Sequence, residues 1–249
     1  MPRVVCVIPA RYGSSRFEGK PLAPIAGKPM IRHVYERVFR CPLVEEAVVA
    51  TDDERIARVV EGFGGRWVMT REDHRSGTDR IAEAVEGMGL DDRDIVINIQ
   101  GDQPLFDPEQ MEEVTTPLLE DDALLFATLI YPIRREEEIT HPNTVKVVFD
   151  AHGYAVYFSR ATIPYVRGGD RPVYYKHHGI YAYRRSFLAY FASLPTGRLE
   201  RLESLEQLRA LENGIRIRVV ESAYDSLEVD TAEDLERAER ILTGEEFMA

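Results

Sequence analysis

The sequence has little cysteine and no long hydrophobic run, and each absence excludes a class of protein. Among 249 residues, Cys6 and Cys41 have no partners for a disulfide framework or a metal-binding spacing, so both are expected to be reduced core thiols. No apolar stretch approaches the ~18 residues of a membrane span. The first residues, MPRVVCVIPARY, also lack the apolar segment and cleavage site of a signal peptide. We therefore expect a cytoplasmic protein without membrane insertion.

Lysine is scarce as well, and acidic residues outnumber basic ones by 43 to 31. The formal net charge is −12, which argues against nucleic acid as a partner. Four of the 31 basic residues are lysines, and two of these, Lys20 and Lys28, lie near the N-terminus. Residues 1–34 carry six positive charges against the one negative charge of Glu18. This local reversal of sign predicts a small polyanion as the ligand, although Lys28 alone is compatible with chance placement on the surface.

The loop after the first apolar run has the composition of a phosphate site but not a common spacing. Gly13, Ser14 and Gly19 allow backbone N–H groups to approach a phosphate, while Arg16 and Lys20 add full charges. The spacing is neither a Walker loop nor GxGxxG, which disfavours a dinucleotide-dependent oxidoreductase. A surface loop without function is the alternative, and the local charge argues against it.

Apolar runs alternate with amphipathic segments through the first half of the chain. Strands are expected at 4–10, 45–53, 66–70 and 94–104, and helices at 29–40, 53–65, 76–89 and 107–120. This alternation predicts a mostly parallel α/β sheet with helices on both faces. The later chain predicts strands at 124–133, 143–150, 154–161, 177–184 and 215–222, and helices at 200–214 and 231–243. We expect one domain, with a nucleotide-binding half (roughly 1–122), a mixed-sheet region (123–220) and a C-terminal segment (221–249).

Two aspartates stand where a cation could bind. Asp102, in QGDQP, follows a buried strand, and Mg²⁺ commonly takes one or two carboxylates together with phosphate oxygens. Asp230, in LEVDTAEDL, precedes a helix that Thr231 is expected to cap. Each aspartate also has a structural interpretation, Asp102 as a turn cap and Asp230 as a helix-entry residue. Spacing alone does not show that they pair.

Other polar stretches are more ambiguous. His177 and His178 lack further ligands at zinc spacing, so a hydrogen bond to a sugar or carboxylate is preferred, with a structural role open for His178. The segment TDDE (51–54) resembles a metal-binding DxD only loosely and is interpreted as a strand end plus a helix cap.

Several stretches in order resemble one family, the 3-deoxy-manno-octulosonate (Kdo) cytidylyltransferases, or CMP-Kdo synthetases. They are IPARYGSSRFEGKPLAPIAGKPMI, VATDDERIA, MTREDHRSGTDRIAE, NIQGDQP, ATLIYPI, NTVKVVFDAHGYAVYFSRATIP, HHGIYAYR, LESLEQLR and VDTAEDLERA. The resemblance covers nearly the whole chain. It implies a Rossmann-like nucleotide-diphospho-sugar transferase fold, with a mostly parallel central sheet, a smaller mixed β-rich region for sugar binding and dimerisation, and a homodimer.

The resemblance also implies a reaction for lipopolysaccharide synthesis, in which CTP and Kdo give CMP-Kdo and pyrophosphate. The anomeric hydroxyl of Kdo would attack the α-phosphorus of CTP, with Mg²⁺ as cofactor. Catalytic roles fall on Arg16, Lys20 and Asp102. Nucleotide contacts fall on Ala10, Arg11, Gly13, Ser14, Lys20 and Ser76. Metal ligation falls on Asp102 and Asp230, and sugar contacts fall on Arg80, Gln100, Arg160, His177, Tyr181, Glu206 and Gln207.

Three segments depart from the family pattern, and three alternatives stay open. Phe17 and Glu18 replace Leu-Pro in the loop, Gln103 replaces a Glu, and Ala232 replaces a Pro. The alternatives are a cytidylyltransferase for another acidic sugar, such as 8-amino-Kdo or a sialic acid, a noncatalytic nucleotide-binding regulator, and a glycosyltransferase. Only the cytidylyltransferases release pyrophosphate from CTP.

Overall fold

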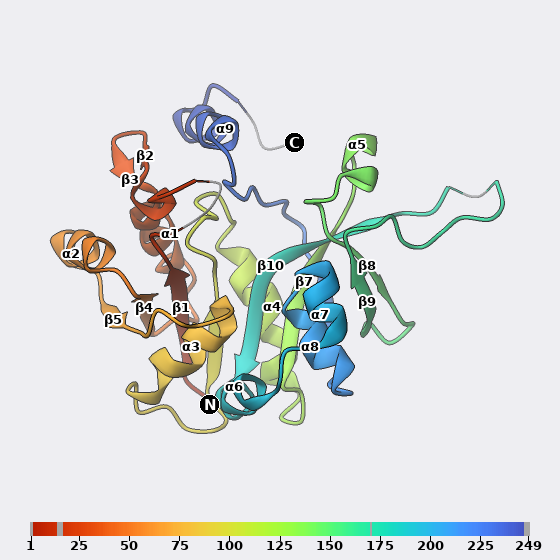
Figure 1. Ribbon diagram of the computed structural model, residues 1–249, viewed down its shortest axis with the longest axis horizontal. Coiled ribbons are helices and arrows are strands. Elements are labelled where there is room, and N and C mark those ends of the chain that lie inside the picture. The colour runs from red at the N-terminus through yellow and green to blue at the C-terminus, as the bar shows by residue number, and fades with distance from the viewer. Residues whose placement is uncertain (1, 14–16, 170, 247–249) are drawn as a thin grey trace.

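The structure is a computed structural model that describes residues 2–13, 17–169 and 171–246 (Figure 1). The strands of the main sheet are β1 (Val4–Ala10), β4 (Glu46–Thr51), β5 (Trp67–Met69), β6 (Ile95–Asn98), β7 (Phe126–Pro132), β8 (Lys146–Phe149), β9 (Ala155–Ser159), β10 (Tyr175–Arg184) and β11 (Arg218–Glu221). The helices are α1 (Met30–Val38), α2 (Glu54–Gly62), α3 (Gly77–Glu86), α4 (Glu109–Glu120), α5 (Glu136–Thr140), α6 (Arg185–Ser193), α7 (Arg198–Glu203), α8 (Gln207–Glu212) and α9 (Ala232–Thr243). The 3₁₀ turn η1 (Lys20–Leu22) and a hairpin of β2 (Pro24–Ile25) and β3 (Lys28–Pro29) lie between β1 and α1.

The main sheet confirms the expected α/β architecture. Its strand order is β11-β7-β10-β6-β1-β4-β5, and the β8–β9 hairpin joins it through β10. Strands β6, β1, β4 and β5 run parallel, whereas β10 runs antiparallel to both of its neighbours, β6 and β7. The first half of the chain therefore builds the parallel part of the sheet, and the later strands add the mixed part.

Strand β1 is buried on both faces, as its continuous apolar run predicts. Cys6 and Ile8 belong to the core that includes residues of α1, α2 and α4, while Val5 and Val7 belong to the core that includes residues of α3 and α6. Figure 1 shows helices on the two sides of this strand. Cys6 and Cys41 are both buried free thiols, and burial raises the pKa of Cys6. Their expected role as core residues is confirmed.

The single helix expected at 200–214 is wrong. The chain forms two short helices, α7 and α8, because Ser204 adopts a left-handed conformation with φ of 53° and ends the first one. The buried Leu205 and Leu208, which lie in the turn after this break, pack into the core that includes residues of β10. The sequence analysis also missed α5, α6 and the β2–β3 hairpin, and β6 ends at Asn98, earlier than expected.

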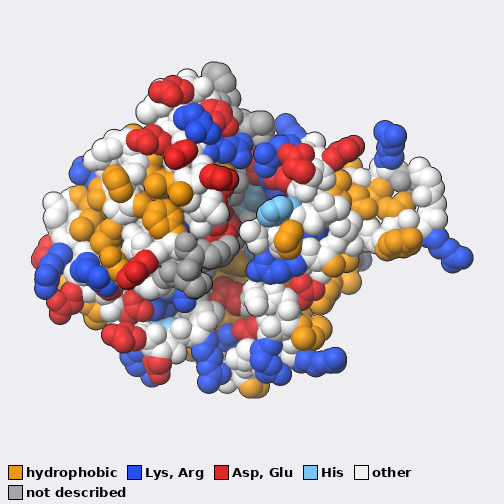
Figure 2. Space-filling model, turned by 45° about the horizontal axis from the view of Figure 1, so that its top comes forward, with side chains coloured by type: hydrophobic (Ala, Val, Ile, Leu, Met, Phe, Trp, Pro, Cys, Tyr) orange, Lys and Arg blue, Asp and Glu red, His pale blue; other side chains and the backbone are white. Residues whose placement is uncertain are grey.

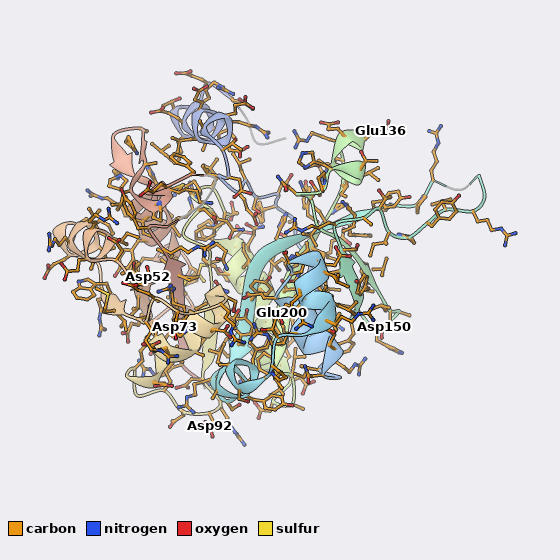
Figure 3. The ribbon with its side chains drawn as sticks, viewed as in Figure 1. Asp52, Asp73, Asp92, Glu136, Asp150 and Glu200 are labelled. Atoms are coloured by element: carbon orange, nitrogen blue, oxygen red, sulfur yellow. The ribbon has the colours of Figure 1, made fainter. Side chains whose placement is uncertain are left out.

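A buried arginine links these two short helices to helix α3. Arg209 is 2% exposed and donates to both carboxylate oxygens of Glu200, at 2.9 and 2.6 Å, and to Asp79 of α3 at 2.8 Å. Burial on its own would lower the pKa of Arg209, but the two carboxylates outweigh it and raise that pKa. Figure 3 labels Glu200 on α7, close to the centre of the molecule. The pairing holds α7 and α8 against α3.

A third, small core brings the C-terminal segment back to the loop after β1. It consists of Ile25, Met30, Leu105, Val229 and Ala238, all buried. Helix α9 begins after Thr231, whose side chain accepts the N–H of Asp234, so the predicted cap is confirmed. This packing places Asp230 beside residues more than 200 positions earlier. The boundaries drawn at 122 and 220 stay a prediction.

Candidate active site

The loop after β1 is closed at its stem. The N–H of Gly19 donates to the carbonyl of Tyr12 at 2.9 Å. Gly19 has a φ of 69°, and a Cβ there would lie 3.1 Å from three atoms of the Tyr12 side chain. The guanidinium of Arg55 lies 3.2 Å from the centre of the same ring, and Asp53 holds this guanidinium at 2.6 Å. These contacts fix the backbone just before Lys20, which is the first residue of η1.

Lys20 lies between the two aspartates that were predicted as metal ligands. Its Nζ is 2.6 Å from Oδ2 of Asp102 and 3.2 Å from Oδ1 of Asp230. Burial would lower the pKa of Lys20, but attraction to Asp102 and Asp230 outweighs it, and the pKa is raised. The two carboxylates therefore converge on one point that holds a positive charge.

Glu228 adds a third carboxylate to this region. Its Oε1 accepts a hydrogen bond of 3.1 Å from Nε2 of Gln103. Glu228 has exposed surface on the cavity wall, yet the surrounding protein desolvates its carboxyl group. This desolvation and the charges of Asp102 and Asp230 raise the pKa of Glu228 to about 7. The site thus has a surplus of negative charge that a bound cation would relieve.

A cavity of about 250 Å³ opens at the carboxyl end of β1. Ala10, Arg11, Lys20 and Ser76 line it, four of the predicted nucleotide contacts. Ser76 caps α3 by accepting the N–H of Asp79 at 3.1 Å, so the positive end of that helix faces the cavity. Gly13 is exposed and lies outside this lining. Ser14 and Arg16 lie outside the described residues.

Arg80 lines the smaller cavity, apart from most of the other predicted sugar contacts, and its role in sugar binding stays a prediction. It is 4% exposed, lines the 250 Å³ cavity and donates to Oγ1 of Thr70 and to Oδ2 of Asp52, each at 2.5 Å. Figure 3 labels Asp52 in the half of the molecule that carries α2. The next residue, Asp53, caps α2 by accepting the N–H of Arg55, so the interpretation of TDDE as strand end and cap is confirmed.

A second cavity, of about 950 Å³, lies beside β10 and carries the other predicted sugar contacts. Its lining includes Gln100, Arg160, His177, Tyr181, Glu206 and Gln207. Residues of α5 form part of one rim, and residues at the start of α9 form part of the other. Figure 2 shows the hollow between the half of the molecule with α1 and α2 and the half with α5 and the β8–β9 hairpin.

The guanidinium of Arg160 is engaged by backbone carbonyls. It donates to Glu203 at 2.7 Å, to Pro142 at 3.0 Å and to Ser204 at 3.4 Å. Lys146, which is fully buried, supports the same wall by donating to the carbonyls of His141, Thr144 and Arg160. These three bonds to carbonyls fix the guanidinium of Arg160 in the cavity wall.

His177 and Glu206 are among the groups lining the larger cavity whose pKa values are shifted. Burial lowers the pKa of His177 to about 3, so its ring is neutral at neutral pH. Burial also raises the pKa of Glu206, although Oε1 of this residue accepts a 2.6 Å hydrogen bond from Thr78 at the start of α3. Glu206 thus joins the wall of the larger cavity to the helix that borders the smaller one.

The sequence analysis missed a buried ionic cluster in the same wall. Lys176 donates to Glu138 of α5 and to Asp225, both at 2.8 Å, and His178 lies 3.2 Å from Asp225. His178 also lies 3.2 Å from the side-chain amide of Gln110, and 3% of its surface is exposed. This buried, hydrogen-bonded position agrees with the structural role that the sequence left open for His178. The scarcity of lysine was the one signal in the sequence that could have drawn attention to Lys176.

The two cavities meet at a shared set of residues. Gln100, Asp102 and Asp230 line both of them. A molecule in the smaller cavity and a second one in the larger cavity would therefore come together at the carboxylates that surround Lys20. This arrangement suits a reaction between two substrates near a cation.

The residues at this junction fit a magnesium ion. The described part of the chain contains no group of three or more His, Cys, Asp or Glu side chains arranged to hold a metal on their own. Mg²⁺ needs only one or two carboxylates when substrate phosphates supply further oxygens. Asp102 and Asp230 provide two carboxylates that already converge on a cation, the ammonium of Lys20.

Residues 5–217 match the profile of a family described as cytidylyltransferase. The chain belongs to this cytidylyltransferase family. A relative in Syntrophus aciditrophicus, described as 3-deoxy-manno-octulosonate cytidylyltransferase, is 66% identical over 98% of this chain and 99% of its own length. A relative in Shewanella sp. (strain ANA-3), described as 8-amino-3,8-dideoxy-manno-octulosonate cytidylyltransferase, is 58% identical over 96% of this chain and 98% of its own.

Solved structures agree with the assignment to the cytidylyltransferases. A CMP:2-keto-3-deoxy-manno-octonic acid synthetase in complex with CTP superposes with a TM-score of 0.91 and 47% identity, covering 98% of this chain and all of the other. A glucose-1-phosphate thymidylyltransferase from Bacillus anthracis, described as putative, shares the fold with a TM-score of 0.67 at 18% identity. The cytidylyltransferase is thus a nucleotidyltransferase in fold and family.

Proposed function

We propose that this cytidylyltransferase activates Kdo for lipopolysaccharide synthesis, converting CTP and Kdo into CMP-Kdo and pyrophosphate. The oxygen of the anomeric hydroxyl attacks the α-phosphorus of CTP, the bond from that phosphorus to the β-phosphate oxygen breaks, and the hydroxyl proton is released. The observation that supports this proposal most strongly is the junction of two cavities at Gln100, Asp102 and Asp230. In-line displacement requires two bound reactants to meet near positive charge.

CTP occupies the smaller cavity in this proposal. Its phosphates approach the positive end of α3 at Ser76, and Arg11 and Lys20 supply charge from the other side. Arg16, in the same loop, is proposed to stabilise the charge that develops on the triphosphate. Lys20 neutralises Asp102 and Asp230 in the ligand-free protein and turns towards the phosphates when the nucleotide binds.

Kdo occupies the larger cavity. Gln100, His177, Tyr181, Glu206 and Gln207 bind its hydroxyl and carboxylate groups. The Nε2 of Gln207 is buried and has no hydrogen-bond partner within the described residues, so it is a donor that the sugar carboxylate can use. Arg80 and Arg160 are proposed as partners of the sugar carboxylate, since the protein oxygens bonded to them take only some of their five N–H donors.

Mg²⁺ is proposed as the cofactor, held by Asp102 and Asp230. When bound, it would neutralise phosphate charge and lower the pKa of a hydroxyl group that coordinates it.

A homodimer in the cytoplasm is proposed as the working state. The segment between β9 and β10 projects from the body of the protein (Figure 1) and exposes apolar side chains, with Tyr165 89% and Val173 59% exposed. Such side chains favour contact with a second copy. None of the helices within residues 2–13, 17–169 and 171–246 has both the length and the apolar character of a membrane span. Sedimentation analysis of the purified protein tests the dimer.

The decisive experiment measures pyrophosphate release with CTP and Mg²⁺ in the presence of Kdo, 8-amino-Kdo, N-acetylneuraminate or no sugar. Release with Kdo alone supports the proposal. Release with 8-amino-Kdo in preference would keep the mechanism and change the substrate, an alternative that the 58% identical relatives favour. Bound CTP without turnover on any sugar would indicate a regulator, and transfer from a nucleotide sugar would indicate a glycosyltransferase.

A further inference from the structure

Thr128 lies in β7 beneath the larger cavity and is fully buried. Its hydroxyl is within hydrogen-bond distance of three groups of β10. These are the carbonyl of Ile180 at 2.8 Å, the carbonyl of His178 at 3.3 Å and Nε2 of His177 at 3.0 Å.

An irregularity in the sheet explains why the three groups meet there. The pairing of β10 with β7 shifts register between His178 and Tyr181. At this irregularity the carbonyls of His178 and Ile180 lie within hydrogen-bond distance of the Thr128 side chain. The Thr128 hydroxyl can donate to one of these acceptors, and the carbonyl of Ile180 is the nearer at 2.8 Å.

Counting protons then determines the tautomer of His177. A threonine hydroxyl has one proton to donate, and a carbonyl oxygen can only accept. The proton of Thr128 is directed to the nearer carbonyl, that of Ile180, so its oxygen must accept from the histidine. His177 therefore carries its proton on Nε2, which leaves Nδ1 as a hydrogen-bond acceptor. Among the described residues, no hydrogen bond involves this Nδ1.

We propose that Thr128 is a positioning residue that fixes the Nε2–H tautomer of His177, so that Nδ1 accepts a hydrogen bond from a substrate hydroxyl. An acceptor at this point of the cavity selects a group that donates and repels a carboxylate. The inference deepens the proposed function because it assigns the His177 position to a hydroxyl of the sugar. The carboxylate of the sugar must then bind elsewhere in the cavity.

The first test is the imidazole ¹⁵N spectrum of the ligand-free protein, with His177 assigned by a His177→Gln variant. The chain has six histidines, so the signals can be resolved. We expect one tautomer, with the proton on Nε2 and slow exchange of that proton with water. A proton on Nδ1 would overturn the inference. This readout does not depend on catalysis, so it stands even if Kdo proves not to be the substrate.

The second test compares Thr128→Val, which keeps the shape and removes the hydroxyl, with Thr128→Ser, which keeps the hydroxyl. We expect the valine variant to raise the KM for the sugar about tenfold, the order of one hydrogen bond, with the KM for CTP unchanged. The serine variant should restore the wild-type KM. An unchanged sugar KM in the valine variant would contradict a positioning role. If the valine variant does not fold, the spectrum of the serine variant and the wild type still decides the tautomer.

Discussion

The chemistry of the site depends first on single charged residues, and Lys20 is the most informative. Its ammonium occupies the point where Asp102 and Asp230 converge, at 2.6 and 3.2 Å, so it stands where the proposed Mg²⁺ would bind. The ligand-free protein therefore balances these carboxylates internally. When the triphosphate binds, its phosphates offer Lys20 another partner, so the ammonium can leave Asp102 and Asp230 free for the metal. Metal binding and nucleotide binding should therefore strengthen one another.

Replacing Lys20 with alanine should have two opposite effects. Turnover should fall at least ~100-fold, as when one charge-stabilising group is removed from an active site. In the absence of nucleotide, Mn²⁺ should bind on the order of tenfold more tightly, since a neighbouring unit charge contributes about 1–4 kcal/mol. Pyrophosphate assays and electron paramagnetic resonance of free Mn²⁺ measure the two effects.

Lys28→Ala is the matched control for Lys20→Ala. Lys28 pairs with Glu36 of α1 at 2.7 Å and lines neither cavity, so both turnover and Mn²⁺ affinity should stay near wild type. Near-normal turnover in Lys20→Ala would contradict the role given to that lysine.

Asp102→Asn should abolish Mg²⁺-dependent turnover, because the amide loses the charge that a hard cation requires. The measurement is pyrophosphate release across a Mg²⁺ titration. The same residue sits on the shared boundary of both cavities, so a change in Mg²⁺ demand is more diagnostic than a loss of rate alone. Full activity with an unaltered Mg²⁺ requirement would place the metal elsewhere.

Among the structural elements, the stem of the loop between β1 and η1 should be sensitive to a small substitution. Gly19 combines a left-handed backbone with close contact to Tyr12, and Arg55 from α2 covers the ring. Stacking of this kind holds a loop in place without secondary structure.

Gly19→Ala should therefore weaken CTP binding and turnover, because the new methyl group pushes Tyr12 out of place. Gly27→Ala is the control, since Gly27 has a similar φ of 77° but has no neighbouring atoms within 4 Å of an added Cβ. In both variants the alanine in a left-handed conformation should destabilise the protein by about 1–2 kcal/mol. Only Gly19→Ala should change the KM for CTP. Calorimetry and steady-state kinetics separate these effects. Equal kinetic losses in both variants would mean that the ring contact is unimportant.

The break between α7 and α8 explains the largest error in the expected elements. Residues 200–214 have a helical spacing of apolar residues, which predicted one helix. The turn at Ser204 instead directs Glu206 to the start of α3 and buries Gln207 at the cavity wall. The spacing of apolar residues predicts which face of a segment is buried. It does not predict that the Glu206 carboxylate accepts a hydrogen bond from Thr78, far away in the sequence.

Over the molecule as a whole, the half-buried His177 couples stability to pH. Its pKa is about 3 in the folded protein, against an ordinary value of 6.5. Between these values the unfolded chain binds a proton that the folded protein does not, so stability falls as the pH falls from 6.5 towards 3. The slope is about 1.4 kcal/mol per pH unit at most.

Urea unfolding between pH 7 and 4 measures this contribution. His177→Gln should flatten the slope, whereas the exposed His152 is the control, and His152→Gln should leave the slope unchanged. A His177→Gln variant with the full wild-type slope would show that the histidine is not held neutral.

The sequence determined the alternation of strands and helices, the family, and the identity of most candidate site residues. Continuous apolar runs such as β1 can only be buried on both faces, and the caps at Ser76 and Thr231 depend on neighbours three residues away. These are local relations, so they can be predicted from spacing. The folded structure alone decided which distant residues meet: Lys20 with Asp102 and Asp230, Thr128 with His177, and Arg80 with Asp52. Those contacts arise from sheet order and core packing, which bring Lys20 to Asp230 across 210 residues of the chain.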